Sequence, residues 1–327
     1  MMARSIEHAP RRLLPIRVGV SRCLLGEEVR YDGGHKRDRF LTEVVGRYVE
    51  WVPICPEVEA SLGTPREAMR LVSDTRQPRL LTIKTDQDMT KPLKMFTEHK
   101  LEALEGADLS GYIFKKDSPS CGIERVPVFN QRGMLNRTGV GLFAGGFVKR
   151  FPLIPVEEEG RLRDPVMRDN FIERVFSYHR WQMLAQGPVS RKAVVEFHRA
   201  HKYLLLAHSR QHYESLSKLV ARVGRFRPKE LIERYGAGFM EALTVKATPW
   251  KHVNVLRHIV GHVKEQLATN ERAELNGVVD DYQRGLVPLV APITLIKHYA
   301  VRYRIDYVRN QVYLNPHPEE LQLRNYL

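Results

Sequence analysis

The chain has 327 residues, of which 43% are hydrophobic and 28% are charged. This balance is typical of a folded globular protein and excludes the fibrous, collagenous and largely disordered classes. Lys and Arg number 52 against 38 Asp and Glu, and the resulting charge of +14 indicates an anionic partner. The length suggests two domains, each large enough to bury a core of its own.

Three cysteines are too few, and odd in number, for a disulfide framework. No apolar run approaches the ~20 residues that span a bilayer. The segment Met1–Arg12 mixes charged and apolar residues and lacks the apolar core of a signal peptide. We therefore expect a cytoplasmic protein with no membrane partner.

The first half alternates short β-rich runs with helical patterns. Strands are expected at Ile16–Val20, Glu50–Ile54, Leu80–Lys84, Gly111–Phe114 and Phe151–Val156. Apolar residues at helical spacing predict a helix over Leu93–Leu104, and the glycine-rich segment Gly139–Phe147 is expected to open another. This alternation favours an α/β domain over residues 1–156, with a Rossmann-like parallel sheet and helices on its faces.

The run Glu157–Gly160 is expected to mark the domain boundary, because β-rich runs are lacking beyond it. Breaks at Pro or Gly separate the helices expected in residues 157–327, which are Pro165–Ala185, Ser190–Ala207, Gln211–Val223, Pro228–Leu243, Trp250–Leu267, Arg272–Gly285 and Ala291–Asp306. The second domain is therefore predicted to be all-α.

Positive charge is densest in the middle of this second domain. Residues 191–272 hold 16 basic and seven acidic side chains, together with seven of the 13 histidines. A large anion spread over one face would suit such a stretch. The alternative is that the basic side chains only solvate the helices.

The cysteines share one position in the expected fold. Cys23, Cys55 and Cys121 each follow the C-terminal end of a strand, where ligands bind in open parallel sheets, so we expect the three thiols to meet. A zinc site is disfavoured because the chain has no Cys-x-x-Cys pair. A 4Fe-4S cluster with one open iron and three buried reduced thiols both remain possible interpretations.

Residues suited to catalysis flank two of the cysteines. Glu57 lies two residues after Cys55, and Ser118 lies three residues before Cys121. A carboxylate there can act as a general base, and a serine hydroxyl can orient a substrate or relay a proton.

Two turn-forming segments supply candidate substrate-binding residues. Tyr31 and Asp32 belong to Arg30–Gly34, which could clamp a planar ligand that forms hydrogen bonds. Arg66 belongs to Gly63–Glu67, and its guanidinium could hold a phosphate or a carboxylate. Ordinary turn and salt-bridge chemistry is the alternative for both segments.

Five blocks of residues 15–155, taken in order, resemble the thiouracil desulfidase (TudS) family. They are Ser21-x-Cys23-Leu24-Leu25-Gly26, Arg30-Tyr31-Asp32-Gly33-Gly34, Cys55-Pro56-Glu57, Gly63-Thr64-Pro65-Arg66-Glu67 and Ser118-Pro119-Ser120-Cys121-Gly122. The resemblance implies a 4Fe-4S cluster on the three cysteines, with one open iron. It also implies that Glu57 and Ser118 are catalytic, and that sulfur leaves thiolated uracil without net redox change.

The second half is similar to the YbgA-like domain. The matching stretches are His198-x-x-His201-Lys202-Tyr203-Leu204-Leu205, Asn254-Val255-Leu256-Arg257-His258, Tyr282-x-x-Gly285-Leu286-Val287-Pro288-Leu289 and Tyr313-Leu314-Asn315-Pro316-His317-Pro318. The two-domain combination resembles the RudS group, which implies conversion of 4-thiouridine in tRNA to uridine with release of hydrosulfide. On this hypothesis we expect phosphate contacts from Lys202, Arg222, Arg225, Arg227 and Lys251.

Three other functions remain open at this stage. The protein could act on free thiouracil or thiouridine nucleotides, with the helical domain as a lid or dimer interface. It could be an iron–sulfur sensor that binds RNA without turnover. Basic helices do not distinguish DNA from RNA, so an accessory role in DNA repair is the third.

Overall fold

A computed structural model of the protein describes residues 15–72, 78–130, 133, 135–187 and 190–326. The segment Met1–Arg12, discussed above for its charge, lies outside these residues. Within them, no helix combines the length and the apolar character that crossing a membrane requires.

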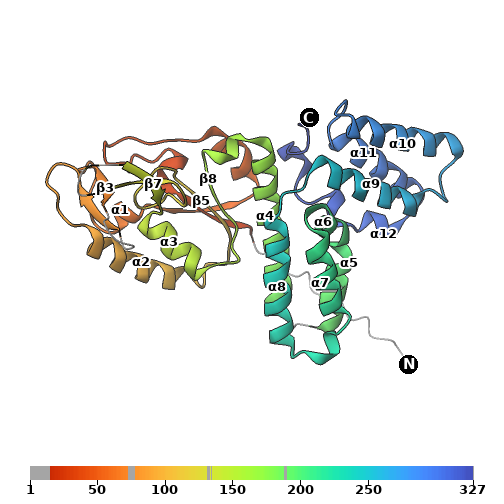
Figure 1. Cartoon of the computed structure of the whole chain (residues 1–327), viewed down its shortest axis with the longest axis horizontal. Coiled ribbons are helices and arrows are strands. Elements are labelled where there is room, and N and C mark those ends of the chain that lie inside the picture. Colours follow the sequence, from red (N-terminus) through yellow and green to blue (C-terminus); the bar gives the residue numbers. More distant parts are fainter. Residues whose placement is uncertain (1–14, 73–77, 131–132, 134, 188–189, 327) are drawn as a thin grey trace, which may run out of the picture.

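Four parallel strands form the sheet that carries the cysteines (Figure 1). In spatial order they are β2 (Glu50–Ile54), β1 (Arg17–Ser21), β5 (Leu109–Phe114) and β8 (Val156–Glu158). Every residue of β5 is buried, which is typical of a parallel strand covered on both faces. The predicted α/β class, with a Rossmann-like parallel sheet followed by helices, is confirmed.

Strand β8 begins later than predicted. The expected strand Phe151–Val156 forms only at its last residue and then continues through Glu158. Pro152 and Pro155 lack the N–H that a strand ladder needs, which explains the late start. Glu157, expected at the domain boundary, therefore lies within the sheet.

A second, mixed sheet packs beside the first, and the sequence predicts only one of its strands. Its spatial order is β4 (Arg79–Thr82), β3 (Met69–Val72), β6 (Val126–Phe129) and β7 (Leu135–Gly139). Only β4 overlaps an expected strand, Leu80–Lys84. The others have four or five residues, and four of the five residues of β7 are exposed, so no alternating apolar face marks them.

Helices cover both faces of the parallel sheet. A short helix, α1 (Pro56–Glu59), follows β2, and α2 (Thr90–Leu104) and α3 (Leu142–Arg150) pack on one face over a core of buried aromatic rings. On the other face, α4 (Pro165–Ala185) shares a core with β1 and β5. Figure 1 shows α4 standing between this sheet and the remaining helices, so it belongs to both halves of the chain.

The remaining helices follow the predicted order with two differences: one predicted helix is split, and the helix predicted over Ala291–Asp306 ends at Arg302 and is followed by a separate short helix. They are α5 (Arg191–Ala200), α6 (Lys202–His208), α7 (Arg210–Val220), α8 (Pro228–Thr244), α9 (Pro249–Val263), α10 (Thr269–Gln283), α11 (Val290–Arg302) and α12 (Asp306–Arg309). The single helix predicted over Ser190–Ala207 is two helices, because the backbone leaves helical geometry at His201, with φ −98° and ψ 7°.

Buried ion pairs connect α4 to the C-terminal residues. Glu173 on α4 accepts hydrogen bonds from His208 (2.5 Å) and Arg324 (2.7 Å). Asp169, one turn earlier, contacts His317 at 3.2 Å. Burial alone would raise the pKa of Glu173, but His208 and Arg324 hold it below its usual range. The pairs with Arg324 and His317 join segments that are more than a hundred residues apart in sequence.

The paired histidines of the second half are core residues. His198 contacts the Tyr235 hydroxyl and the Ser217 hydroxyl, each at 3.0 Å. The Nδ1 of His201 lies 2.7 Å from the Phe197 carbonyl, so Nδ1 carries the proton, and its ring stacks on Phe197. Both histidines therefore pack the helical core.

Gly111 on β5 allows α4 to approach the sheet. A Cβ at this position would lie 2.7 Å from Val175 Cγ2 on α4, and the branched valine has little freedom to move away. We therefore expect Gly111→Ala to destabilise the protein by about 1–3 kcal/mol, measured as a lower thermal midpoint.

Gly106→Ala is the matched control for this substitution, because a Cβ there meets no atom within 4 Å. It should leave the midpoint unchanged or raise it slightly. Equal midpoints for the two variants would contradict the packing argument.

His201 makes stability depend on pH. Burial lowers the pKa of His201 in the folded chain to about 3, below the ordinary value of 6.5. As the pH falls, the unfolded chain binds the proton first, so stability is lost between these two values at about 1.4 kcal/mol per pH unit. His201→Leu removes this contribution. Its free energy of unfolding in urea should therefore fall less than that of the wild type between about pH 7 and pH 5.

The exposed His99, replaced by Gln, provides the control for His201→Leu and should follow the wild type. The prediction fails if His201→Leu has the same pH dependence as the unmodified protein.

Candidate active site

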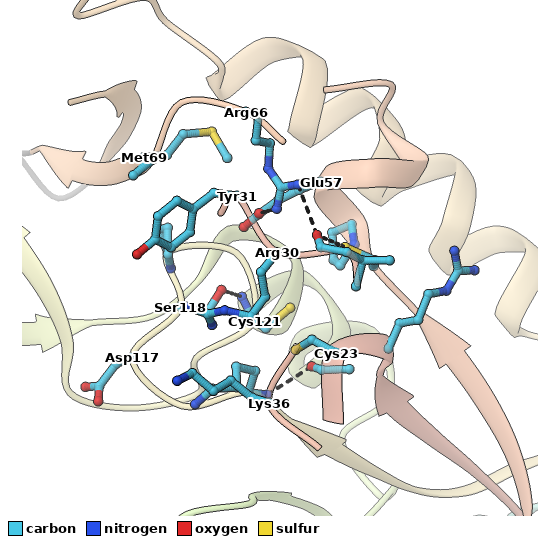
Figure 2. A pocket seen from close by; sticks show the side chains of 18 of the residues that line it. Cys23, Arg30, Tyr31, Lys36, Glu57, Arg66, Met69, Asp117, Ser118 and Cys121 are labelled. Atoms are coloured by element: carbon cyan, nitrogen blue, oxygen red, sulfur yellow. Dashed lines mark hydrogen bonds and ion pairs between the residues drawn. The ribbon is translucent and has the colours of Figure 1, made fainter. Parts of the chain in front are cut away.

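The three cysteines converge because of the strand order. Cys23 lies two residues past β1, Cys55 directly follows β2, and Cys121 lies in the loop after β5. Since β1 lies between β2 and β5, the ends of all three strands meet at one edge of the sheet. A cavity of about 400 Å³ opens there and is lined by the three cysteines, Glu57 and Ser118 (Figure 2).

All three thiols are reduced and resist deprotonation. Burial, together with the charge of a neighbouring Cys55 thiolate, raises the pKa of Cys23 to about 11. Burial likewise raises the pKa values of Cys55 and, more strongly, Cys121. Three thiolates this close would repel one another electrostatically. A positively charged metal group is therefore needed to hold all three in the deprotonated form.

The arrangement of the thiols limits what they can hold. Among the described residues, no group of three or more His, Cys, Asp or Glu side chains is arranged to bind a metal ion. A cubane cluster differs from a single ion because each thiolate binds a separate corner iron, so its ligands surround a volume. Three thiols around one cavity therefore fit an iron–sulfur cluster and do not fit a mononuclear zinc site.

Glu57 is held in place by two side chains. Arg66 forms an ion pair with its Oε2, and the Ser120 hydroxyl donates to its Oε1 at 2.6 Å. Arg66 also donates to the carbonyls of Val29 and Gly63, at 3.0 and 2.9 Å. Arg66, expected to bind substrate, thus orients Glu57 in this structure, and its contact with a substrate remains a prediction.

Ser118 uses its oxygen within its own loop. Its Oγ accepts hydrogen bonds from the backbone N–H groups of Ser120 (3.3 Å) and Cys121 (3.1 Å). The hydroxyl proton is therefore available to a ligand in the cavity. The pairing of Ser120 with Glu57 was missed from the sequence, because no local pattern relates residues 63 positions apart.

The N-terminus of α3 fixes the loop that carries Ser118 and Cys121. The Pro119 carbonyl accepts from the N–H of Leu142, and the Ser120 carbonyl accepts from those of Phe143 and Ala144. Gly141 makes this approach possible, because a Cβ there would lie 2.5 Å from the Ser120 carbonyl carbon.

Ser21, which the sequence left without a role, supports the same loop. The backbone N–H of Lys115 donates to its Oγ at 2.9 Å. A hydrogen bond from the Ser21 side chain also lowers the pKa of Cys121 and partly offsets burial. Ser21 therefore links the end of β1 to the third cysteine.

Tyr31 and Asp32, both expected to bind substrate, lie in different surroundings. Tyr31 lines the cavity with 43% of its surface exposed, and the Arg30 guanidinium lies 5.3 Å from its ring centre. Asp32 is not among the residues that line the cavity, and it accepts a hydrogen bond from the Gly34 N–H, which lowers its pKa. Lys36, missed from the sequence, lines the cavity and is exposed.

The expected RNA-binding residues fall into two groups. Arg222, Arg225 and Arg227 are exposed at the tip of the hairpin formed by α7 and α8 (Figure 1). Lys202 is half-buried, with its ammonium 5.1 Å from the Tyr203 ring centre. The Lys251 ammonium donates to the backbone carbonyls of His208 and Lys246.

Comparisons with known proteins match two separate parts of the chain. The family model described as 2-thiouracil desulfurase matches residues 18–159, and the model described as protein of unknown function DUF1722 matches residues 202–318. A solved structure of the [4Fe-4S]-dependent thiouracil desulfidase TudS is 28% identical, with a TM-score of 0.37, covering 45% of this chain and 93% of that chain.

Two curated relatives are uncharacterised proteins. YbgA of Escherichia coli K12 is 30% identical over 158 residues, which are 48% of this chain and 94% of YbgA. YbbK of Bacillus subtilis 168 is 30% identical over 108 residues, which are 32% of this chain and 71% of YbbK. The chain therefore carries a domain that matches the 2-thiouracil desulfurase family over residues 18–159, and its second half belongs to the YbgA-like DUF1722 family.

Proposed function

We propose that the protein converts 4-thiouridine in tRNA to uridine by a non-redox hydrolysis that releases hydrosulfide. The observation that favours an RNA substrate is the hairpin tip, residues 218–229, which contains five basic residues and no acidic one. All five are exposed, and no ion pair engages them within the part of the chain that the structure describes. Such a surface suits a phosphate backbone.

We propose that Cys23, Cys55 and Cys121 hold a 4Fe-4S cluster. Bound by three protein thiolates, such a cluster would have one iron without a cysteine ligand, and it would supply a Lewis acid for the exocyclic sulfur of the base. The residues around the cavity then have to orient the base, activate water and move protons.

Glu57 is the proposed general base. Arg66 and Ser120 fix both of its oxygens, and these still have lone pairs to accept a proton from water. The water oxygen bonds to C4 of the base, the C–S bond breaks, and sulfur leaves as hydrosulfide. One water is consumed, C4 keeps its oxidation state, and no electron donor is required.

Ser118 is proposed to guide the base. Its hydroxyl proton can donate to the exocyclic atom or to a ring nitrogen of the base, since its oxygen already accepts two backbone N–H groups. Tyr31 at the cavity mouth offers an exposed ring on which a base extruded from the RNA can stack.

The shape of the molecule favours tRNA over a free base. Figure 1 shows the α7–α8 hairpin pointing away from the sheet that carries the cavity. Only an extended ligand can contact both the hairpin tip and the cavity, and a free thiolated base can contact only one of them.

Replacing Glu57 with Gln should keep the cluster and abolish most turnover. The amide keeps the shape of the side chain but cannot take a proton, so we expect kcat to fall by about 10²–10⁴-fold, with the iron content and visible absorbance unchanged. Asp117→Asn is the control, because Asp117 also lines the cavity but forms ion pairs with Lys116 and Arg137. Loss of absorbance in Glu57→Gln would instead indicate a role in holding the cluster.

The substrate proposal is tested by anaerobic incubation of the reconstituted protein with bulk tRNA and, separately, with free 4-thiouracil. Nucleoside analysis should show loss of 4-thiouridine from tRNA at a higher kcat/KM than for the free base. A higher kcat/KM for free 4-thiouracil would favour the small-molecule function. Failure to release hydrosulfide from either substrate would favour a non-catalytic sensor.

The hairpin tip should matter for tRNA alone. Replacing Arg222, Arg225 and Arg227 by Ala should raise KM for thiolated tRNA about ten- to hundredfold and lower its salt dependence by roughly one unit of slope per lost phosphate contact. Turnover of free 4-thiouracil should not change.

A charge-matched triple variant provides the control for the hairpin. Lys192, Arg210 and Arg234 are exposed on α5, α7 and α8, and each pairs with a Glu on its own helix. Replacing these three by Ala removes the same charge and should change KM for tRNA much less. Equal effects of the two triple variants would contradict a specific role for the tip.

A further inference from the structure

The acidic run at the end of β8 contacts the loop that carries Ser118 and Cys121. One Glu158 oxygen, Oε1, accepts hydrogen bonds from the backbone N–H groups of Ile123 (2.8 Å) and Glu124 (3.4 Å). Glu159 Oε2 accepts from the N–H of Lys116 at 2.8 Å, and its Oε1 pairs with the Lys115 ammonium.

These hydrogen bonds and the ion pair hold both ends of one loop. Lys115 and Lys116 open the loop after β5, and Ile123 and Glu124 close it just past Cys121. Parallel pairing of Phe114 with Glu158 sets the two carboxylates beside the loop. Between these contacts, the carbonyls of Pro119 and Ser120 accept hydrogen bonds from the N-terminus of α3, so the ends and the middle of the loop are both held.

The burial of these carboxylates indicates that their contacts matter. Glu158 is only 6% exposed, and burial raises its pKa, so placing a carboxyl group there costs free energy that its donors offset. The loop gains in turn, because its backbone N–H groups need acceptors when they are withdrawn from water. A carboxylate whose only role was to face solvent would lie exposed at the surface and would not be buried in this way.

We propose that Glu158 and Glu159 are positioning residues, which hold the ends of the 115–124 loop and thereby set where Ser118 and Cys121 face the cavity. Their link to catalysis rests on the proposed function, whereas their effect on the loop does not. Neither residue lines the cavity, so they act through the loop and not on the substrate.

Adjacent Glu157 offers a matched control. It is also 6% exposed and lies in the same strand, but its side chain pairs with Arg161 at 2.8 Å and has no hydrogen bond to the 115–124 loop among the described contacts. Glu158→Ala and Glu157→Ala therefore remove the same group at the same burial, with and without a direct hydrogen bond to the loop, since Glu157 reaches Glu124 only through Arg161.

The test is the rate at which iodoacetamide alkylates each cysteine in the cluster-free full-length chain, followed by mass spectrometry. Glu158→Ala should speed alkylation of Cys121 about tenfold relative to Cys23, because Cys23 lies in the separate short 3-10 helix Arg22–Leu25 and reports general loosening. Glu158→Gln keeps an acceptor oxygen and should restore the wild-type ratio. Glu157→Ala should leave the ratio unchanged.

Two results would overturn the proposal. One is an equal rise for Cys121 and Cys23 in Glu158→Ala, which would indicate only lower global stability. The other is the same change of ratio in Glu157→Ala. In the reconstituted protein, Glu158→Ala should lower kcat for thiolated substrate more than it changes KM. A changed alkylation ratio in a protein that desulfurates no substrate would retain the positioning role and reject the proposed function.

Discussion

The site depends on the spatial order of three parallel strands. Because β1 lies between β2 and β5, three chain segments that are far apart in sequence end at one edge of the sheet, and each brings one cysteine. This order is stable only while both faces of the sheet are covered. The aromatic core beneath α2 and α3 covers one face and α4 covers the other, so the packing of the whole first half maintains the separation of the thiols.

Burial gives the cavity its chemistry and also creates a cost. Apolar surroundings raise the pKa values of the three thiols, and they would leave a carboxylate such as Glu57 poorly solvated. Specific hydrogen-bond donors offset this cost of burial. Arg66 and Ser120 donate to Glu57, and Ser21 donates to Cys121. Polar groups around the cavity are therefore oriented before a ligand arrives, and such preorganisation is what catalysis requires.

Local sequence patterns predicted the elements whose causes are local. Alternation and apolar runs located β1, β2 and β5, and the start of α4 follows from Asp164, whose side chain caps the N–H groups of Val166 and Met167. Strands β3, β6 and β7 were not predicted from the sequence, because their register is set by pairing with neighbouring strands. The candidate site shows the same division: the cysteines, Glu57 and Ser118 occur in recognisable turns, whereas Ser120, Ser21 and Glu158 act through contacts with distant residues.

The helical half is built into the molecule through α4. One side of this helix packs on β1 and β5, and its Asp169 and Glu173 hold the C-terminal residues through buried ion pairs. Removing either partner of such a pair would leave an uncompensated buried charge, so these contacts keep the C-terminal residues on α4, whose other side packs on the sheet. The offset between the α7–α8 hairpin and the cavity is then fixed by packing and not by a linker. On the proposed function, a fixed offset would let the protein select one nucleotide of a folded RNA, because the anchored backbone would determine which base reaches the cavity.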